Sequence, residues 1–149
     1  MKKTMLIGLI AMTLSSVTFA EGIKWHTWDE GVKMAKKENK PMMVFVYASW
    51  CHVCKKMNDK TFRSGEVVPP ANQNFIPVKL DIDAEETYTL NGKSYKGKEI
   101  LLELAVGQQM GIPTTIFYYP KSDKKFLEVG YKTADEFVPV LKKYAELKP

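Results

Sequence analysis

Apolar residues along this chain fall into short blocks whose spacing predicts alternating helices and strands. A continuous apolar run at 42–47 follows Pro41 and predicts a strand covered on both faces, as in the centre of a sheet. Other blocks predict strands at 75–82, 115–119 and 126–129, and helical spacing predicts helices at 28–39, 55–62, 98–109 and 134–147. This order of helices and strands is typical of a single α/β domain.

Polar residues and a proline refine the ends of these elements. The residues at 27–30 and 133–136 have the capping-box form, in which a Thr and a Glu satisfy free backbone amides at a helix start. Pro139 lies past the first turn of the last helix, so it should kink that helix or delay its start. Asn91-Gly92 separates two short β-prone runs and predicts a type I′ hairpin.

The N-terminal segment has the pattern of an export signal. Lys2 and Lys3 precede an apolar run at 5–17, and Thr18-Phe19-Ala20 supplies a small-x-small ending. The run is shorter than the roughly 18 to 20 apolar residues of a spanning helix, which argues against an uncleaved membrane anchor. We therefore expect a signal peptide at 1–20, a mature domain at 21–149, and a periplasmic location.

Net charge changes little of this picture. The 149-residue chain carries a formal charge of +5, which falls to +3 without Lys2 and Lys3. Arg63 is the single arginine, and nucleic-acid recognition depends heavily on arginine. Nucleic acid is therefore not an expected partner. The sequence contains no repeat, linker or dimerisation segment, so we expect a monomer.

The two cysteines, Cys51 and Cys54, are too few and too close for a structural disulfide framework. They follow the buried strand, with Cys51 near a helix N-terminus, where free amides and the helix dipole favour a thiolate. Cys54 lies about one turn later, where it can attack a mixed disulfide formed on Cys51. Haem attachment would need His at position 55, which is Lys, and structural zinc would need about four ligands. We expect no metal and no cofactor beyond the redox-active disulfide.

Three features together resemble the thioredoxin superfamily, and the resemblance covers nearly the whole mature chain. They are the run Trp50-Cys51-His52-Val53-Cys54-Lys55, the run Gly111-Ile112-Pro113-Thr114 about 60 residues later, and Gly130 after the last strand. The implied fold is a central mixed β-sheet flanked by helices, here with an extra N-terminal helix and a short hairpin insertion at 87–98. The chain is similar to exported members such as SoxW-type thioredoxins and the C-terminal domain of the periplasmic thiol:disulfide interchange reductase.

The resemblance also implies roles for individual residues. Pro113 would be cis and, with Ile112, would face the cysteine pair and offer backbone groups to an extended substrate. Trp50 directly precedes Cys51, so we expect it to tune the site or to contact substrate. One departure concerns proton transfer, because Phe45 stands where many thioredoxins carry a buried Asp, whereas Lys79 occupies the position of the family's partner lysine. Water or another carboxylate would then accept the proton of Cys54, with Lys79 as a candidate for support.

The two residues between the cysteines are expected to tune the site. His52 would add a charge or a hydrogen-bond donor near Cys51, or else face solvent. Oxidases and isomerases of this fold usually carry His directly before the second cysteine, where this chain has Val53.

We therefore predict a thiol:disulfide oxidoreductase that reduces protein disulfides and is itself reduced by a membrane thiol:disulfide reductant. A disulfide-forming oxidase and a non-catalytic peptide-binding module remain the alternatives.

Overall fold

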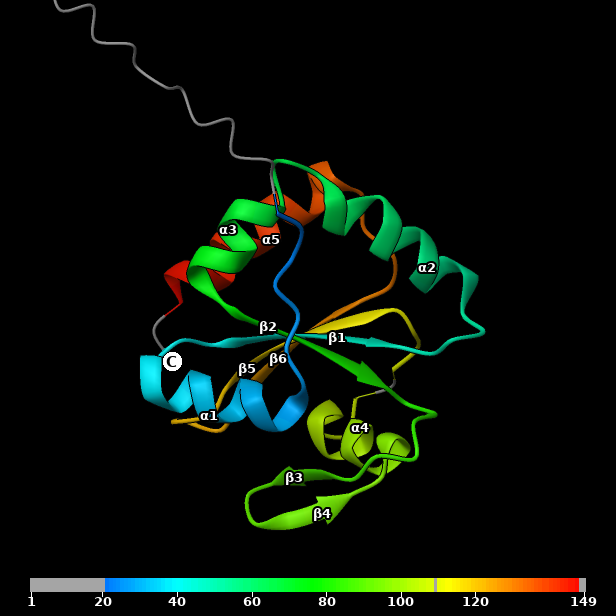
Figure 1. The fold of residues 1–149 in the computed structure, drawn as a ribbon, viewed down its shortest axis with the longest axis vertical. Helices are drawn as coiled ribbons and strands as arrows, with labels where there is room; N and C mark the ends of the chain where they lie inside the picture. Colours follow the sequence, from blue (N-terminus) through cyan, green and yellow to red (C-terminus); the bar gives the residue numbers. More distant parts are fainter. Residues whose placement is uncertain (1–20, 109, 148–149) are drawn as a thin grey trace, which may run out of the picture.

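The computed structural model describes residues 21–108 and 110–147, which form a sheet with helices on both faces (Figure 1). The predicted signal peptide at 1–20 lies outside the described residues. The main elements are α1 (Trp28–Glu38), β1 (Met42–Tyr47), α2 (His52–Asp59), α3 (Val68–Asn74), β2 (Ile76–Asp81), β3 (Tyr88–Leu90), β4 (Lys93–Tyr95), α4 (Gly97–Ala105), β5 (Thr114–Tyr119), β6 (Lys124–Val129) and α5 (Ala134–Glu146). None of the helices in these two stretches is long and apolar enough to cross a membrane.

The four main strands pair in the order β2-β1-β5-β6. β1 runs parallel to β2 and antiparallel to β5, and β5 is antiparallel to β6. The sheet is therefore mixed, and β1 occupies the interior position that its unbroken apolar run predicts. His26 pairs with Val78 at the outer edge of β2. The predicted thioredoxin fold, with its extra N-terminal helix and small hairpin, is confirmed.

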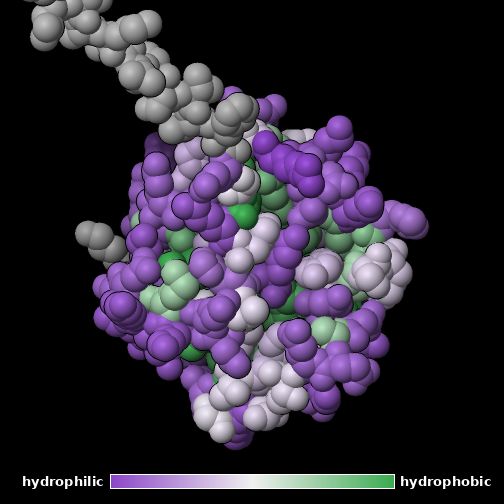
Figure 2. Space-filling model, viewed as in Figure 1, coloured by the Kyte–Doolittle hydropathy of each residue, from purple (hydrophilic) through white to green (hydrophobic). Residues whose placement is uncertain are grey.

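Two apolar clusters lie on opposite faces of the sheet because neighbouring residues in a strand point to opposite sides. Phe45 and Phe117 pack in the cluster on the side of α2, α3 and α5. Val44 and Ile116 pack in the other cluster, on the side of α1 and α4. Figure 2 shows mainly hydrophilic residues on the face in view, with the hydrophobic ones in small separate patches.

Helix ends follow the capping signals closely. α1 begins at Trp28, where the Thr27 amide donates to the Glu30 carboxylate at 3.1 Å. α5 begins at Ala134, after the corresponding Thr133 cap. Pro139 lies within α5 and is exposed, so the prediction that it delays the helix start was wrong.

The hairpin turn also agrees with its sequence. Asn91 and Gly92 both have positive φ, 51° and 79°, as a type I′ turn requires. The hairpin is anchored to α1 because the Trp28 indole donates to the carbonyl of Thr89 at 2.8 Å.

Three helices differ from the predictions. α2 runs from His52 to Asp59, three residues earlier than the predicted 55–62. α3 was not predicted, and its first turn contains Pro69 and Pro70, since proline is tolerated in a first helical turn. α4 ends at Ala105, since Val106 and Gly107 both adopt left-handed backbone conformations, φ 50° and 74°. The helix predicted to 109 therefore stops earlier, and residue 109 itself lies outside the described residues.

Candidate active site

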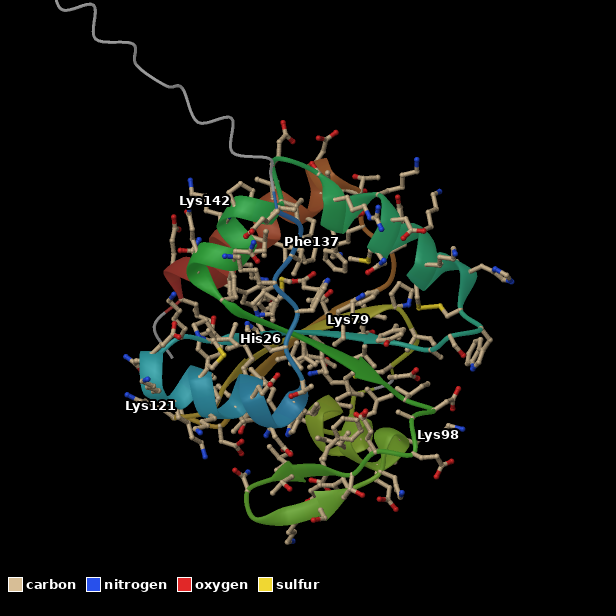
Figure 3. All side chains as sticks on the ribbon, in the orientation of Figure 1. His26, Lys79, Lys98, Lys121, Phe137 and Lys142 are labelled. Atoms are coloured by element: carbon tan, nitrogen blue, oxygen red, sulfur yellow. A yellow bond between two sulfur atoms is a disulfide. The ribbon has the colours of Figure 1, made fainter. Side chains whose placement is uncertain are left out.

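Cys51 and Cys54 form a disulfide at the junction between β1 and α2, visible as a yellow bond in Figure 3. Their Cα atoms are 5.2 Å apart. Cys51 is the N-cap residue of α2, and its amide donates to the carbonyl of Ala48 at 3.1 Å, which fixes the turn after the strand. The strand and the helix start together determine where the first sulfur lies.

The Cys51 sulfur accepts a hydrogen bond from the backbone amide of Cys54 at 3.2 Å. The first turn of α2 contains no acidic residue, so no nearby negative side chain in that turn opposes charge on the sulfur. An amide donor and a helix N-terminus both stabilise an anion at this atom. When the disulfide is reduced, this arrangement favours the thiolate of Cys51.

The surroundings of the two sulfurs are unequal. Cys51 is 7% exposed and Cys54 is 2% exposed, so the first cysteine is the more accessible. Trp50 precedes the pair and Val53 lies between the two cysteines, and they are 63% and 49% exposed. His52 is also exposed, as the first residue of α2. These three side chains form an outer rim that an incoming protein would meet.

Trp50 is held by a residue that sequence reasoning missed, Asp83. The indole N–H donates to the Asp83 carboxylate at 2.6 Å, and Lys98 forms an ion pair with the same carboxylate at 3.3 Å. The hydrogen bond from Trp50 holds the pKa of Asp83 below its ordinary value, with Lys98 contributing. The available sequence signal was a polar residue just beyond the end of a strand adjacent to β1.

Gly97 permits this arrangement. A β-carbon at Gly97 would lie 2.5 Å from the carbonyl oxygen of Ile82. Only glycine therefore allows the first turn of α4 to approach the end of β2 so closely. That approach brings Lys98 to Asp83.

Pro113 is cis, as the resemblance implied. Its carbonyl accepts a hydrogen bond from the amide of Gly130 at 2.8 Å. Gly130 has φ 91°, in the region that favours glycine, which explains the glycine after the last strand. Ile112 packs against both apolar clusters, one of which contains Cys51 and Cys54.

A cavity of about 180 Å³ adjoins the disulfide. Phe45 and Lys79 line it and are register neighbours on β1 and β2. The lining includes both cysteines and Asn58, and no carboxylate is among the described residues that form it. The position of the usual acid is therefore occupied by the Phe45 ring, which stacks on Tyr47 and meets Phe62 edge-on.

Lys79 is half-buried beside this cavity. Its ammonium lies 5.1 Å from the ring centroid of Trp25 and 5.8 Å from that of Tyr47. Burial lowers the pKa of Lys79, nearby Arg63 lowers it further, and Asp59 acts in the opposite direction. Lys79 forms no ion pair within residues 21–108 and 110–147, and it lines the same cavity as the cysteine pair.

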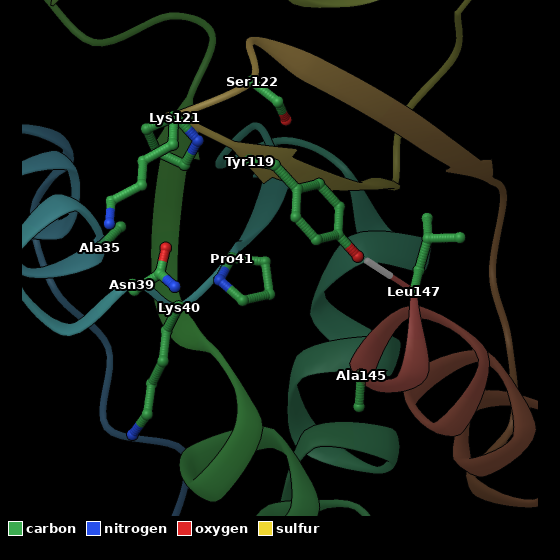
Figure 4. A pocket seen from close by; sticks show the side chains of 10 residues that line it. Ala35, Asn39, Lys40, Pro41, Tyr119, Lys121, Ser122, Ala145 and Leu147 are labelled. Atoms are coloured by element: carbon green, nitrogen blue, oxygen red, sulfur yellow. The ribbon is translucent and has the colours of Figure 1, made fainter. Parts of the chain in front are cut away.

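Another cavity, of about 640 Å³, lies elsewhere (Figure 4). Pro41 and Tyr119 line it, at the start of β1 and the end of β5. This is the opposite end of the sheet from Cys51, which follows the end of β1. The cavity therefore takes no part in the site described here.

The thioredoxin-like domain family matches residues 28–145, which include the cysteine pair and Pro113. The chain belongs to the thioredoxin-like family. The match covers every main helix and strand of the domain, apart from the last residue of α5.

Two relatives place the chain within this family. Over 119 residues it is 31% identical to spermatogenesis-associated protein 20 of Mus musculus, covering 74% of this chain and 15% of that protein. Over 125 residues it is 27% identical to the thiol:disulfide interchange protein DsbD of Ralstonia nicotianae, covering 81% of this chain and 19% of DsbD. The chain thus spans less than a fifth of either relative, and the second match confirms the predicted likeness to the interchange reductase.

A solved structure, the DsbH oxidoreductase, superposes with a TM-score of 0.65 and covers 95% of this chain and 96% of its own. At 20% sequence identity, this likeness establishes the shared fold. The thioredoxin-like domain with its Cys51–Cys54 disulfide is therefore supported by both sequence and structure.

Proposed function

We propose that this protein is a periplasmic thiol:disulfide oxidoreductase that reduces disulfides in other proteins. The observation that carries the proposal is the Cys51–Cys54 disulfide at the start of α2, in which the sulfur of the more exposed residue, Cys51, accepts a hydrogen bond from the Cys54 amide. The export pattern at 1–20 supports the periplasmic location. The likeness to DsbD supports exchange with thiols and disulfides of protein partners.

In the proposed reaction, the Cys51 thiolate attacks one sulfur of a substrate disulfide. The substrate S–S bond breaks, the leaving sulfur takes up a proton, and a mixed disulfide forms on Cys51. Cys54 then loses its proton and attacks the Cys51 sulfur, which releases the second substrate thiol. Two electrons have passed to the substrate, and the Cys51–Cys54 disulfide has formed again.

Other residues of the site would assist these steps without reacting. Trp50, Val53 and Ile112 offer apolar contact to the substrate, and Pro113 offers backbone groups beside the pair. Lys79 would stabilise negative charge as Cys54 loses its proton. The proton itself would pass to water, because no described residue lining the cysteine cavity is a carboxylate.

The reaction requires that the disulfide be reduced again after each turnover. We propose a membrane thiol:disulfide reductant as the electron donor, since the periplasm is kept oxidising. Exchange between the donor's dithiol and Cys51–Cys54 balances the two electrons given to substrate.

The reduction potential of the Cys51/Cys54 couple, measured against glutathione, tests the direction of this reaction. A reduction potential of about −270 mV is expected for a thioredoxin-like reductant. A reduction potential of about −120 mV would contradict the proposal and assign the protein to the disulfide-forming oxidases.

Trapping with Cys54→Ser tests the order of attack. Without the resolving sulfur, partner proteins should accumulate as mixed disulfides on Cys51, and a reductant should release them. Cys51→Ser is the matched control and should trap far fewer partners. Full function in a cell carrying either variant would instead support a non-catalytic peptide-binding module.

A further inference from the structure

A second hollow, of about 430 Å³, adjoins the cysteine cavity and shares Asn58 and Lys79 with it. Arg63, Trp25 and Phe62 also line this hollow. Its volume lies within the range of about 300 to 1,000 Å³ that is usual for small-molecule sites. The proposed exchange reaction does not use it.

Two positive side chains face the same hollow. Arg63 is exposed, whereas Lys79 is half-buried. Neither forms an ion pair with any residue in the described part of the chain. Two like charges around one partly buried space repel each other, and an anion bound between them would offset this repulsion.

The carboxylate of Asp59 acts on one of these two cations, Lys79. It also accepts a hydrogen bond from the Asn58 amide at 3.0 Å. Asp59 is not among the residues that line the hollow, and it forms no ion pair with Arg63 or Lys79 within the described residues. It therefore weakens the positive field without filling the space between the two cations.

Part of the lining of the hollow is apolar, beside the polar side chains of Asn58, Arg63 and Lys79. The rings of Trp25 and Phe62 meet edge-to-face with centroids 5.2 Å apart, and Ile23 and Val68 complete this apolar part. A guanidinium matches a carboxylate in planar, two-point geometry, and aromatic walls favour an apolar body over a hydrated inorganic ion. We propose that this hollow binds a small organic carboxylate, with its charge between Arg63 and Lys79 and its body against Trp25 and Phe62.

The test uses benzoate as the probe and the oxidised protein. Titration followed by NMR should give saturable shifts of the Lys79 side chain and the Trp25 indole. Benzamide has the same shape without the charge, and it should bind about tenfold more weakly, as should inorganic phosphate, which lacks the apolar body. Affinity for benzoate should also fall as salt is raised.

Variants locate the site. Arg63→Gln should weaken benzoate binding about tenfold, and Lys79→Met should do the same. Lys60→Gln is the matched control, because it removes one positive charge three residues from Arg63 at a position that does not line the hollow. This control should leave the affinity unchanged, and the NMR spectrum of each variant shows whether it is folded.

Three results would overturn the proposal. Shifts that do not saturate would show that benzoate has no site there. Equal binding of benzamide or phosphate would show that charge and apolar body are not recognised together. Equal affinity in a folded Arg63→Gln protein would place the carboxylate somewhere else.

Discussion

Cys51 owes its expected reactivity to its position as the N-cap of α2. In the reduced protein its thiol should have a pKa below the ordinary value of about 8.5, because the Cys54 amide and the helix start both favour the thiolate. Ultraviolet absorbance of the thiolate, followed against pH, measures this directly. A pKa of Cys51 above the ordinary value would contradict the prediction. His52→Ala should shift the reduction potential of the Cys51/Cys54 couple, and an unchanged potential would leave His52 as a surface residue.

Lys79 should influence the redox couple through its charge. Lys79→Met removes a cation beside the cysteine cavity, so the thiolate becomes less stable, the pKa of Cys51 rises and the reduction potential becomes more negative. The same absorbance titration and a glutathione equilibrium measure both quantities. Lys36→Met, on the exposed face of α1, is the control for loss of one charge and should leave both values unchanged. A potential that moves equally in the two variants would show that only net charge matters.

Single residues differed in how far the sequence could predict them. Cys51 and Cys54 were evident because their spacing, after a buried strand, already defines the chemistry. The cis form of Pro113 came only from the family resemblance, since nothing local in the sequence requires it. Asp83 was missed because its hydrogen bond joins residues 33 positions apart, and only the paired strands bring them together.

Glu128 on β6 joins the last strand to the last helix. Its carboxylate accepts a hydrogen bond from the Tyr144 hydroxyl at 2.8 Å and forms ion pairs with Lys132 at 3.3 Å and Lys143 at 3.5 Å. Burial acts to raise the pKa of Glu128, but the Tyr144 hydrogen bond and the two lysines outweigh it and hold the pKa below the ordinary 4.5. The ionised carboxylate therefore stabilises the contact between β6 and α5.

Glu128→Gln should lower the free energy of unfolding by about 1 kcal/mol at neutral pH, because it removes these charge-assisted contacts. A lowered pKa contributes stability that is present above the ordinary carboxyl pKa and is lost as pH falls through the lowered value. The difference in the free energy of unfolding between the original protein and Glu128→Gln should therefore shrink in acid. Urea unfolding of both proteins at neutral and acidic pH measures this difference.

The control for this substitution is Glu103→Gln, at an exposed carboxylate of α4 that has no ion pair among the described residues. It should leave stability nearly unchanged at both pH values. If the stability lost in Glu128→Gln were the same in acid as at neutral pH, the shape of the side chain, and not its charge, would determine the contact between β6 and α5.

Helices and strands were predictable where the local signal was strong. The apolar run predicts where β1 begins and ends, and the capping boxes predict where α1 and α5 begin. The structure agrees closely with these predicted boundaries. α3 is short, and its first turn contains two prolines, so propensity alone argues for a loop. Burial of Val68 and Ala71 under the same side of the sheet as Phe137 favours the helix instead.

The layered arrangement of the whole molecule follows from the burial of its central strands on both faces. Helices cover both faces of the sheet, and the cysteine pair lies where β1 passes into α2 (Figure 1). The sequence was sufficient to predict this layering and the redox pair. It was not sufficient to predict the two neighbouring cavities, because their walls come from the N-terminal segment, β1, α2 and β2 together.

The short pairing of His26 with the outer edge of β2 has a consequence for association between molecules. The His26 amide donates to Pro77 at 2.9 Å, and the Lys79 amide donates to the His26 carbonyl at 3.4 Å. Backbone groups along the middle of that edge are thereby occupied. A strand from another chain cannot add there without displacing this segment, so the segment protects the β2 edge against edge-to-edge aggregation.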